Sequence, residues 1–172
     1  LDKIKSNSIE IKNLKKNTKF VTLDGVERQL NGNDLMICDE DIPMCIAGVF
    51  GGDLHGVNNN THSIFLESAC FNSVSIRKTA KYHSINSDAS FRFERGIDIE
   101  MVKYSLKRAA LLICEICGGK ICSDIIDEYS NKIESKSILL NYEKTNNLIG
   151  QVIPPEEIKS ILTSLDFKIN NI

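Results

Sequence analysis

The fold is decided by the stretch LMICDEDIPMCIAGVFGG at residues 35–52. Its two runs at 35–38 and 44–49 predict two buried strands, because nearly every side chain in them is apolar. Just upstream, residues 20–30 hold Asp24-Gly25 between two short strand-forming runs, which is typical of a β-hairpin turn. The first part of the chain is therefore expected to form a β-sheet.

Cap residues and apolar spacing predict helices further along. Asn72 can cap a helix over 73–82, and Asp98 can cap one over 99–117 that stops at Gly118-Gly119. The longer helix is amphipathic, since its apolar side chains recur at helical spacing: Val102, Leu106, Ala109, Ile113 and Ile116. Further short strands are expected at 63–68, 121–127 and 167–169.

The composition changes at 130–137, which is polar and charged, and the later pattern is again helical. Residues 142–149 predict a short helix ending at Gly150, and PPEE at 154–157 predicts the start of another. That helix carries one apolar stripe of Ile158, Ile161, Leu162 and Leu165. A unit below roughly 40 residues seldom buries a core alone. We therefore expect a domain up to about residue 130 and an incomplete second module after the change in composition.

The composition is that of a folded protein without membrane spans. The chain has 172 residues, of which 42% are hydrophobic and 26% charged, so wholesale disorder is not expected. No window approaches the roughly 20 apolar residues of a membrane helix. The chain begins with Leu1 rather than Met, which suggests a fragment or a processed product.

The charge distribution is uneven, although the net charge is only −2. Residues 73–108 hold eight basic side chains against four acidic ones, whereas acidic side chains dominate in 121–143. A basic face of this kind could contact a phosphate backbone through Arg77, Lys78 and Lys81, or be an ordinary solvated helix surface. Nothing in the composition points to DNA or to a membrane.

The six cysteines do not form a recognisable metal motif. Cys114 and Cys117 fall on the last turn of the predicted amphipathic helix, where cysteine behaves as a small buried hydrophobe. No second Cys-x-x-Cys or histidine pair lies at zinc-finger spacing, so we assign no metal. Scattered, unpaired cysteines fit a reducing, cytoplasmic location.

Two features are candidate parts of a site, each with two interpretations. The glycines Gly48, Gly51 and Gly52 match no phosphate-binding motif; they could serve a tight turn that needs a positive φ, or line a pocket with backbone. Glu67 follows an apolar run, and a buried carboxylate is costly unless it is paired or used. It could belong to a site or form a structural ion pair with Arg92 or Arg95.

Several motifs, in this order and spacing, carry a family resemblance: LESA at 66–69, FN at 71–72, SIR at 75–77, SDAS at 87–90 and RFERG at 92–96. The segments IAGVFGG at 46–52 and ICEICGG at 113–119 agree with them. The chain resembles the beta-subunit family of bacterial phenylalanyl-tRNA synthetases over nearly its whole length. The resemblance implies an α+β fold: a mixed α/β editing domain followed by the start of a winged-helix-like module from about residue 134.

The resemblance also implies an activity, namely hydrolysis of tyrosine wrongly attached to phenylalanine tRNA. Glu67 matches the carboxylate that recognises the tyrosine hydroxyl, Gly48 and Gly51 match glycines lining that pocket, and Ser87 and Ala89 match positions that shape it. Phenylalanine, which lacks the hydroxyl, would leave Glu67 desolvated and unpaired, so correctly charged tRNA would be spared. Arg77, Lys78 and Lys81 are expected, on local charge, to hold the tRNA acceptor end.

The family context implies partners outside this chain. ATP and magnesium belong to the whole enzyme, an alpha2-beta2 heterotetramer whose alpha subunit makes Phe-tRNA, and no cofactor is expected here. The chain departs from the family pattern at Asn86 and Ser87, where the family commonly has His and Thr, and a family His motif lies upstream of the position matching Leu1. The competing interpretation is a non-catalytic RNA-binding or scaffold module whose editing has decayed.

Overall fold

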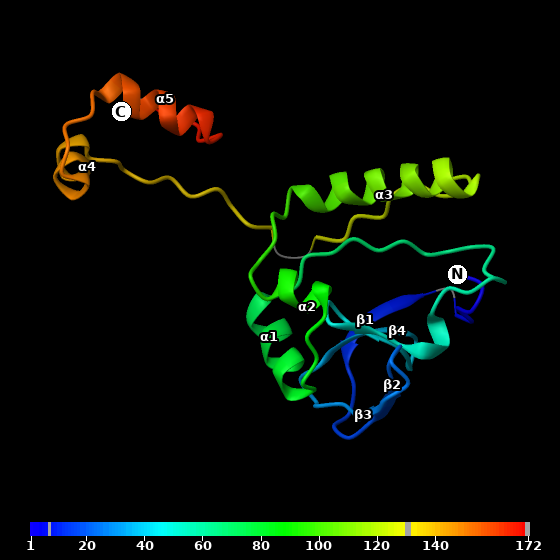
Figure 1. The fold of residues 1–172 in the computed structure, drawn as a ribbon. Helices are drawn as coiled ribbons and strands as arrows, with labels where there is room; N and C mark the ends of the chain where they lie inside the picture. Colours follow the sequence, from blue (N-terminus) through cyan, green and yellow to red (C-terminus); the bar gives the residue numbers. More distant parts are fainter. Residues whose placement is uncertain (7, 130–131, 171–172) are drawn as a thin grey trace. The chain divides into compact units, whose positions relative to one another are not determined.

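The computed structural model describes residues 1–6, 8–129 and 132–170 and divides the chain into two compact units, Leu1–Ser123 and Asp124–Ile172. The predicted α+β class is confirmed, because antiparallel sheets and helices both occur (Figure 1). The predicted domain boundary at residue 130 falls outside the described residues. The division into 1–130 and 134–172 therefore stays a prediction.

The first unit is built on an antiparallel sheet of strand order β1-β4-β5-β6 within the described residues. These strands are β1 (Ile9–Asn13), β4 (Leu35–Asp39), β5 (Ile42–Ile46) and β6 (Phe50–Gly51). A second sheet pairs β2 (Lys19–Val21) with β3 (Glu27–Gln29) around the Asp24-Gly25 turn. The predicted hairpin and the strand at 35–38 are thus confirmed, while the strand expected at 44–49 ends at Ile46.

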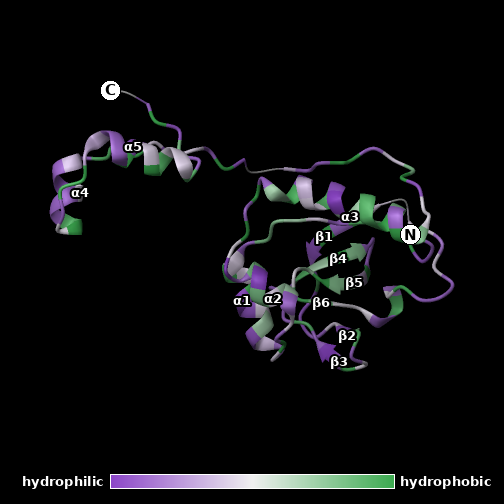
Figure 2. Ribbon diagram, turned by 45° about the horizontal axis from the view of Figure 1, so that its top comes forward, coloured by the Kyte–Doolittle hydropathy of each residue, from purple (hydrophilic) through white to green (hydrophobic). Residues whose placement is uncertain are grey.

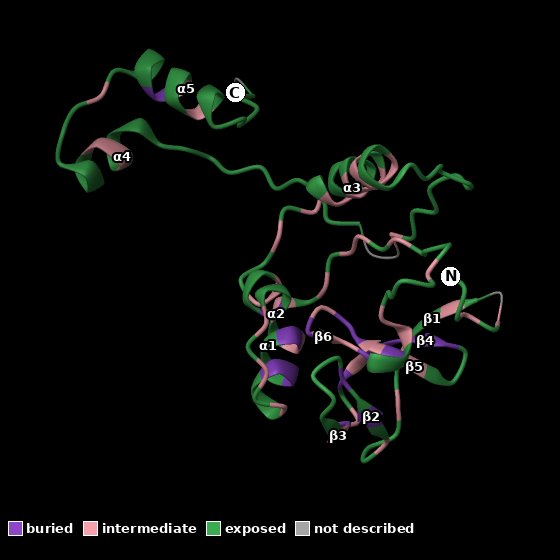
Figure 3. Ribbon diagram, turned by 45° about the vertical axis from the view of Figure 1, so that its right-hand side comes forward, coloured by how far each residue is buried: buried purple, intermediate pink, exposed green. Residues whose placement is uncertain are grey.

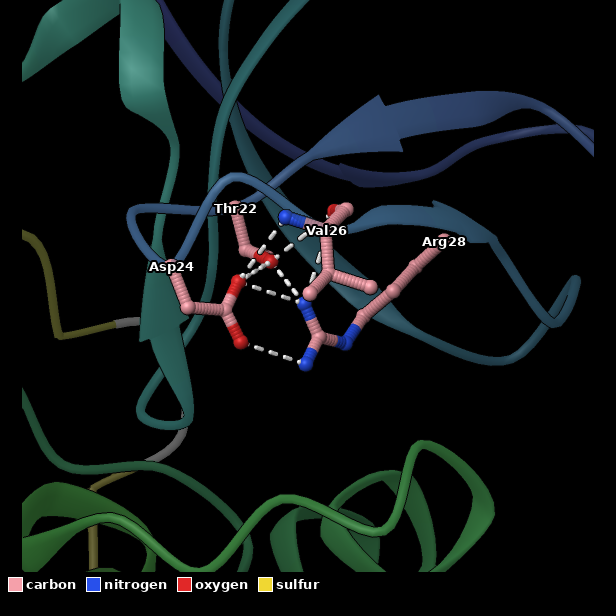
Figure 4. A network of polar contacts seen from close by, with 4 residues as sticks. All are labelled: Thr22, Asp24, Val26 and Arg28. Atoms are coloured by element: carbon pink, nitrogen blue, oxygen red, sulfur yellow. Dashed lines mark hydrogen bonds and ion pairs between the residues drawn. The ribbon is translucent and has the colours of Figure 1, made fainter.

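The hairpin turn is held by a side-chain network (Figure 4). Both terminal nitrogens of Arg28 donate to the carboxylate of Asp24 at 2.8 Å, and Arg28 also contacts the hydroxyl of Thr22. The Arg28 guanidinium and the Thr22 hydroxyl hold the pKa of Asp24 far below its usual range. The carboxylate therefore stays ionised and fixes the turn.

The hydrophobic core lies between β4, β5 and helix α1 (Ser73–Tyr82). Figure 3 shows buried residues on these strands and on the face of α1 that is turned to them. Asn72 caps α1 as predicted, with its side-chain oxygen accepting the N–H of Ser75 at 3.0 Å. This core is one cluster of buried side chains: Phe20, Leu30, Met36, Cys38, Ile46, Val49, Ile76 and Ala80.

A buried polar cluster joins α1 to the turn before β4. Asp34 accepts from the hydroxyl of Thr79 at 2.9 Å, and its other oxygen lies 2.6 Å from Nε2 of His83. The same carboxylate accepts the N–H of Asn31 at 2.8 Å. Because these partners come from both elements, they fix the C-terminal end of α1 against the sheet.

Helix α2 (Asp88–Phe93) was not expected from apolar periodicity, and it follows α1 closely in the chain. The long helix α3 (Met101–Cys117) ends at Gly118, whose φ is +69°, as predicted. Asp98 is not its N-cap, which was a wrong prediction: Glu100 is the cap, and the Asp98 carboxylate instead accepts the Glu100 N–H in the preceding turn. Figure 2 shows hydrophobic and hydrophilic residues alternating around α3.

The cysteines near the end of α3 differ in exposure. Cys114 is half-buried, but Cys117 is exposed, so the prediction of a buried thiol is wrong for Cys117. The reason is that none of the residues of α3 is fully buried, and its last turn packs against little of the described chain.

Two further predicted strands are absent from the described residues. Residues 63–68 form an irregular segment that is held by side chains rather than by a strand partner: Asp2 accepts the N–H groups of His62 and Ser63, and Ser68 donates to the carbonyl of Val102 at 2.9 Å. Residues 121–127 also form no strand, since their large apolar side chains gain little burial and Ile126 is 79% exposed.

The second unit contains α4 (Tyr142–Ile149) and α5 (Pro155–Ser164), both as predicted. Gly150 ends α4 with a φ of +80°, and two carboxylates lie in the first turn of α5. The predicted stripe on α5 is only partly internal, because Ile158 is buried whereas Ile161 and Leu165 are exposed. No strand forms over 167–169, where the described residues offer no pairing strand. The winged-helix-like fold stays a prediction.

Within the described residues, no helix combines the length and the apolar composition needed to cross a membrane.

Candidate functional site

A cavity of about 720 Å³ opens in the first unit beside the end of β5. Its walls are formed by the loop from β5 to β6, the segment before α1, the first turn of α2 and the N-terminal part of α3. The lining side chains are mostly apolar or small. They comprise Cys45, Ile46, Gly48, Val49, Phe50, Gly51, Glu67, Ser68, Ala69, Phe71, Ser87, Asp88, Ala89, Phe93, Ile97, Asp98, Met101, Val102 and Ser105.

The cavity brings together the five residues that the family resemblance placed in a pocket, whereas Gly52 is not part of its lining. Gly48 and Gly51 lie on the loop wall, Glu67 on the segment before α1, and Ser87 and Ala89 at the start of α2. These residues are up to 41 positions apart in the chain, so only the fold assembles them. Their roles toward a ligand stay predictions.

Glu67 is a cavity carboxylate without a partner among the described residues, and its pKa is shifted. No hydrogen bond or ion pair joins it to another described residue, and partial desolvation raises the pKa of its carboxyl group, although the residue as a whole is exposed. The ion pair considered with Arg95 is absent, since Arg95 binds Glu94 at 2.9 Å and stacks on the ring of Phe91. A carboxylate in this state can accept a hydrogen bond from a ligand.

Cys45, on β5, also lines the cavity and was not singled out from the sequence. Burial, together with the negative charge of Glu67, raises the pKa of its thiol to about 12. The thiol is therefore protonated at neutral pH and is a poor nucleophile.

Gly48 satisfies both interpretations left open by the sequence, the tight turn and the pocket lining. Gly48 has a φ of +66°, and a Cβ there would lie 2.7 Å from Cδ2 of Phe71 and 2.8 Å from Cδ1 of Ile76. A Cβ on Gly51 would lie 2.8 Å from Cδ1 of Leu23. Both glycines line the cavity. The turn and the packing require glycine at Gly48 independently of any ligand, whereas Gly51 has no positive φ and meets only the flexible side chain of Leu23.

Helix α2 is fixed to the loop wall by its cap. Ser87 accepts the N–H of Ser90 at 3.0 Å, and the Ser90 hydroxyl reciprocates with the Ser87 N–H in a capping box. The Ser87 hydroxyl also donates to the carbonyl of Val49 at 2.6 Å. Ala89 follows in the first turn of α2 and is exposed at the cavity.

The charges of the cavity are all negative. Glu67, Asp88 and Asp98 line it, while the described lining residues include no lysine, arginine or histidine. His83 is instead buried against Asp34, away from the lining set. A site with this charge can accept a cationic group and is unsuited to a phosphate or a free carboxylate.

The three predicted tRNA-binding side chains lie outside the cavity lining. Arg77, Lys78 and Lys81 are exposed on α1, and no ion pair joins them to another described residue. The described residues also hold no group of three or more histidine, cysteine, aspartate or glutamate side chains arranged for a metal ion.

Comparison with known proteins places this architecture in a family. The B3/4 domain family matches residues 1–118, which include the whole cavity. The chain belongs to the B3/4 domain family.

The B3/4 chain is also similar to phenylalanine–tRNA ligase beta subunits. It is 52% identical to that of Bacteroides fragilis over 168 residues, which are 98% of this chain and 20% of the relative. The values are 53% over 169 residues for Bacteroides thetaiotaomicron (98% and 21%) and 49% over 168 residues for Porphyromonas gingivalis (97% and 20%). The predicted resemblance is confirmed, and the chain spans about a fifth of the length of these curated relatives.

Sequence reasoning missed three parts of this B3/4 cavity. Cys45 lies in an apolar run, which is typical of a core residue. Asp88 and Asp98 are aspartates of the kind that is common at the start of a helix. One available signal was position: Asp88 lies between the two predicted pocket residues Ser87 and Ala89, and therefore at the same wall.

Proposed function

We propose that the cavity is an editing site that hydrolyses the ester of tyrosine wrongly attached to phenylalanine tRNA. The observation that carries the proposal is the unpartnered Glu67 carboxylate in a mostly apolar cavity of a B3/4 domain. The cavity volume of about 720 Å³ is ample for one aromatic side chain with its ester end.

Selection of tyrosine rests on Glu67. A phenolic O–H donated to this carboxylate replaces the water that the group loses at the cavity wall. Phenylalanine offers no donor and leaves the charge desolvated, so a pocket of this kind rejects the analogue that lacks the hydroxyl strongly. The rings of Phe71 and Phe93, whose centroids are 5.1 Å apart, supply aromatic surface beside the cavity.

The cavity charge favours an aminoacyl ester over a free amino acid. An ester has lost its carboxylate and keeps its cationic α-ammonium group, which suits a lining with Glu67, Asp88 and Asp98 and no cation among the described residues. The same lining does not fit a triphosphate. We therefore place ATP and magnesium elsewhere in the whole enzyme.

Water is the nucleophile in this proposal. Cys45 is protonated because its pKa is raised to about 12, and the Ser87 hydroxyl is committed to Val49. The chain thus contributes orientation and the exclusion of phenylalanine, and groups of the tRNA itself complete the hydrolysis.

The tRNA is held outside the cavity. Arg77, Lys78 and Lys81 on α1 offer exposed positive charge to the phosphates of the acceptor end. In the whole enzyme the partner is an alpha subunit in an alpha2-beta2 assembly in the cytoplasm, and the second unit begins a winged-helix-like module.

The test compares Glu67→Gln with wild type in the intact synthetase. Glutamine keeps the volume of the side chain but removes the charge. We expect at least a tenfold loss of Tyr-tRNA hydrolysis, with aminoacylation by phenylalanine unchanged. Glu115→Gln, which makes the same change at an exposed glutamate of α3 outside the cavity lining, is the control. Equal rates for Glu67→Gln and wild type would sink the role of Glu67, and a wild-type enzyme that leaves Tyr-tRNA intact would favour the non-catalytic RNA-binding module.

A further inference from the structure

Two walls of the cavity are joined by a hydrogen bond between residues 38 positions apart. The Ser87 hydroxyl, at the start of α2, donates to the main-chain carbonyl of Val49 on the loop between β5 and β6 at 2.6 Å. Val49 is only 1% exposed, so this bond is shielded from water on the loop side. A shielded bond between two separate elements constrains the distance between them.

Further hydrogen bonds join Ser87 to α2. Its oxygen accepts the N–H of Ser90 at 3.0 Å, and its own N–H donates to the Ser90 hydroxyl at 3.0 Å. Ser90 is 2% exposed. A serine hydroxyl has one proton to donate, and that proton is given to Val49. Ser87 therefore has no donor left for a ligand.

We propose that Ser87 is a positioning residue of the editing site, a role that rests on the proposed function. It donates no hydrogen bond to the substrate, because its one hydroxyl proton goes to Val49. It holds α2, which carries Ala89 and Phe93, at a fixed distance from the loop between β5 and β6, which carries Gly48.

This role explains what a side chain at position 87 must supply. The hydroxyl is essential because it makes the hydrogen bond that links the two walls. Any additional side-chain atoms at position 87 would only narrow the cavity. Threonine keeps the hydroxyl, and valine has nearly the same shape as threonine but lacks it. The pair Ser87→Thr and Ser87→Val therefore isolates the hydrogen bond from the added volume.

The experiment measures Tyr-tRNA hydrolysis by the intact synthetase carrying each variant. We expect Ser87→Thr to stay within about twofold of wild type. We expect Ser87→Val to lose about tenfold to a hundredfold in kcat, because a wall displaced by about 1 Å misplaces the ester. KM should change less, since contacts with the body of the tRNA remain.

Ser90→Ala is the matched control. It removes the other half of the capping box but leaves the bond from Ser87 to Val49 in place. If Ser87 acted only as a helix cap, Ser90→Ala and Ser87→Val would lower kcat equally, and that result would overturn the proposal. Thermal unfolding of each variant separates lost stability from lost positioning.

Amide hydrogen exchange over residues 48–51 of the intact synthetase gives a readout that does not need activity. We expect faster exchange in Ser87→Val than in Ser87→Thr. Equal exchange in the two variants, or unchanged kcat in Ser87→Val, overturns this inference. Failure of the proposed function looks different, because wild type itself would then leave Tyr-tRNA intact.

Discussion

Leu23 lies directly behind Gly51: its N–H donates to the Gly51 carbonyl at 3.0 Å, and its side chain occupies the space that a Cβ on Gly51 would need. Leu23 is not part of the cavity lining, whereas Gly51 is. The hairpin of β2 and β3 thus supports one cavity wall from the far side. The turn of this hairpin is held by the ion pair between Asp24 and Arg28.

The first prediction concerns this contact. We expect Gly51→Ala to cost about 1 kcal/mol of unfolding free energy, because the new methyl group meets the flexible end of Leu23. In a Leu23→Ala background the same change should cost nothing measurable. Urea unfolding of the single and double variants gives the coupling energy. Additive effects would show that Leu23 does not limit the space at Gly51.

The second prediction separates backbone strain from packing at Gly48. Gly48 and Gly25 both have a positive φ, of +66° and +74°, but a Cβ on Gly25 would meet nothing within 4 Å. Gly25→Ala should therefore cost only the roughly 1–2 kcal/mol of a left-handed alanine. Gly48→Ala should cost a further 1–3 kcal/mol, approximately, because Phe71 and Ile76 must move. Equal losses in chemical unfolding would contradict the packing argument.

Much of the fold could be predicted because its signals are local. Asn72 caps α1, and Gly118 and Gly150 end α3 and α4, since a cap depends only on neighbours along the chain. The strand expected at 63–68 failed because pairing depends on a distant partner. An apolar run cannot indicate that Asp2 and Val102, rather than another strand, will bind the backbone and side chains of this segment.

The candidate site was predictable in part, for a related reason. The family motifs indicated Glu67, Gly48, Gly51, Ser87 and Ala89, and the fold gathers them at one cavity. The motifs could not indicate that the Ser87 hydroxyl is already engaged by Val49, because that bond depends on how α2 docks against the loop. Cys45, which is half-buried, was missed because a cysteine within an apolar strand carries no signal of its own.

The third prediction concerns the buried cluster around Asp34. Thr79→Val keeps the shape of the side chain but leaves one carboxylate oxygen of Asp34 without its donor at 2.9 Å. We expect a loss of about 1–3 kcal/mol in thermal or urea unfolding, because the unsatisfied group stays buried. Thr18→Val, at an exposed hydroxyl bonded to the Lys15 carbonyl, is the control and should have little effect. Equal losses of unfolding free energy in the two variants would mean that the Asp34 carboxylate can reach water when its Thr79 donor is removed.

The fourth prediction concerns thiol reactivity. The pKa of about 12 at Cys45 keeps that thiol protonated, so N-ethylmaleimide should modify it far more slowly than the exposed Cys70, Cys117 and Cys122. Glu67→Gln removes one of the charges that raise this pKa and should speed the reaction at Cys45 alone. Peptide mass mapping after timed labelling gives each rate. If the labelling rate of Cys45 were unchanged in Glu67→Gln, the charge of Glu67 would not contribute to the raised pKa of the Cys45 thiol.

The last prediction follows from the sign of the shift at Glu67. Burial raises the pKa of this carboxyl group in the folded protein above its ordinary value of 4.5. Between the two pKa values the folded state binds more protons than the unfolded state, so unfolding free energy falls as pH rises through that window. Glu67→Gln has no proton to lose. Its stability relative to wild type should therefore be lowest in acid, rise through the window and level off above it. Thermal unfolding of both proteins from pH 4 to neutral, roughly, tests this, and a relative stability that fell with rising pH would mean that the Glu67 carboxylate is stabilised rather than desolvated at the cavity wall.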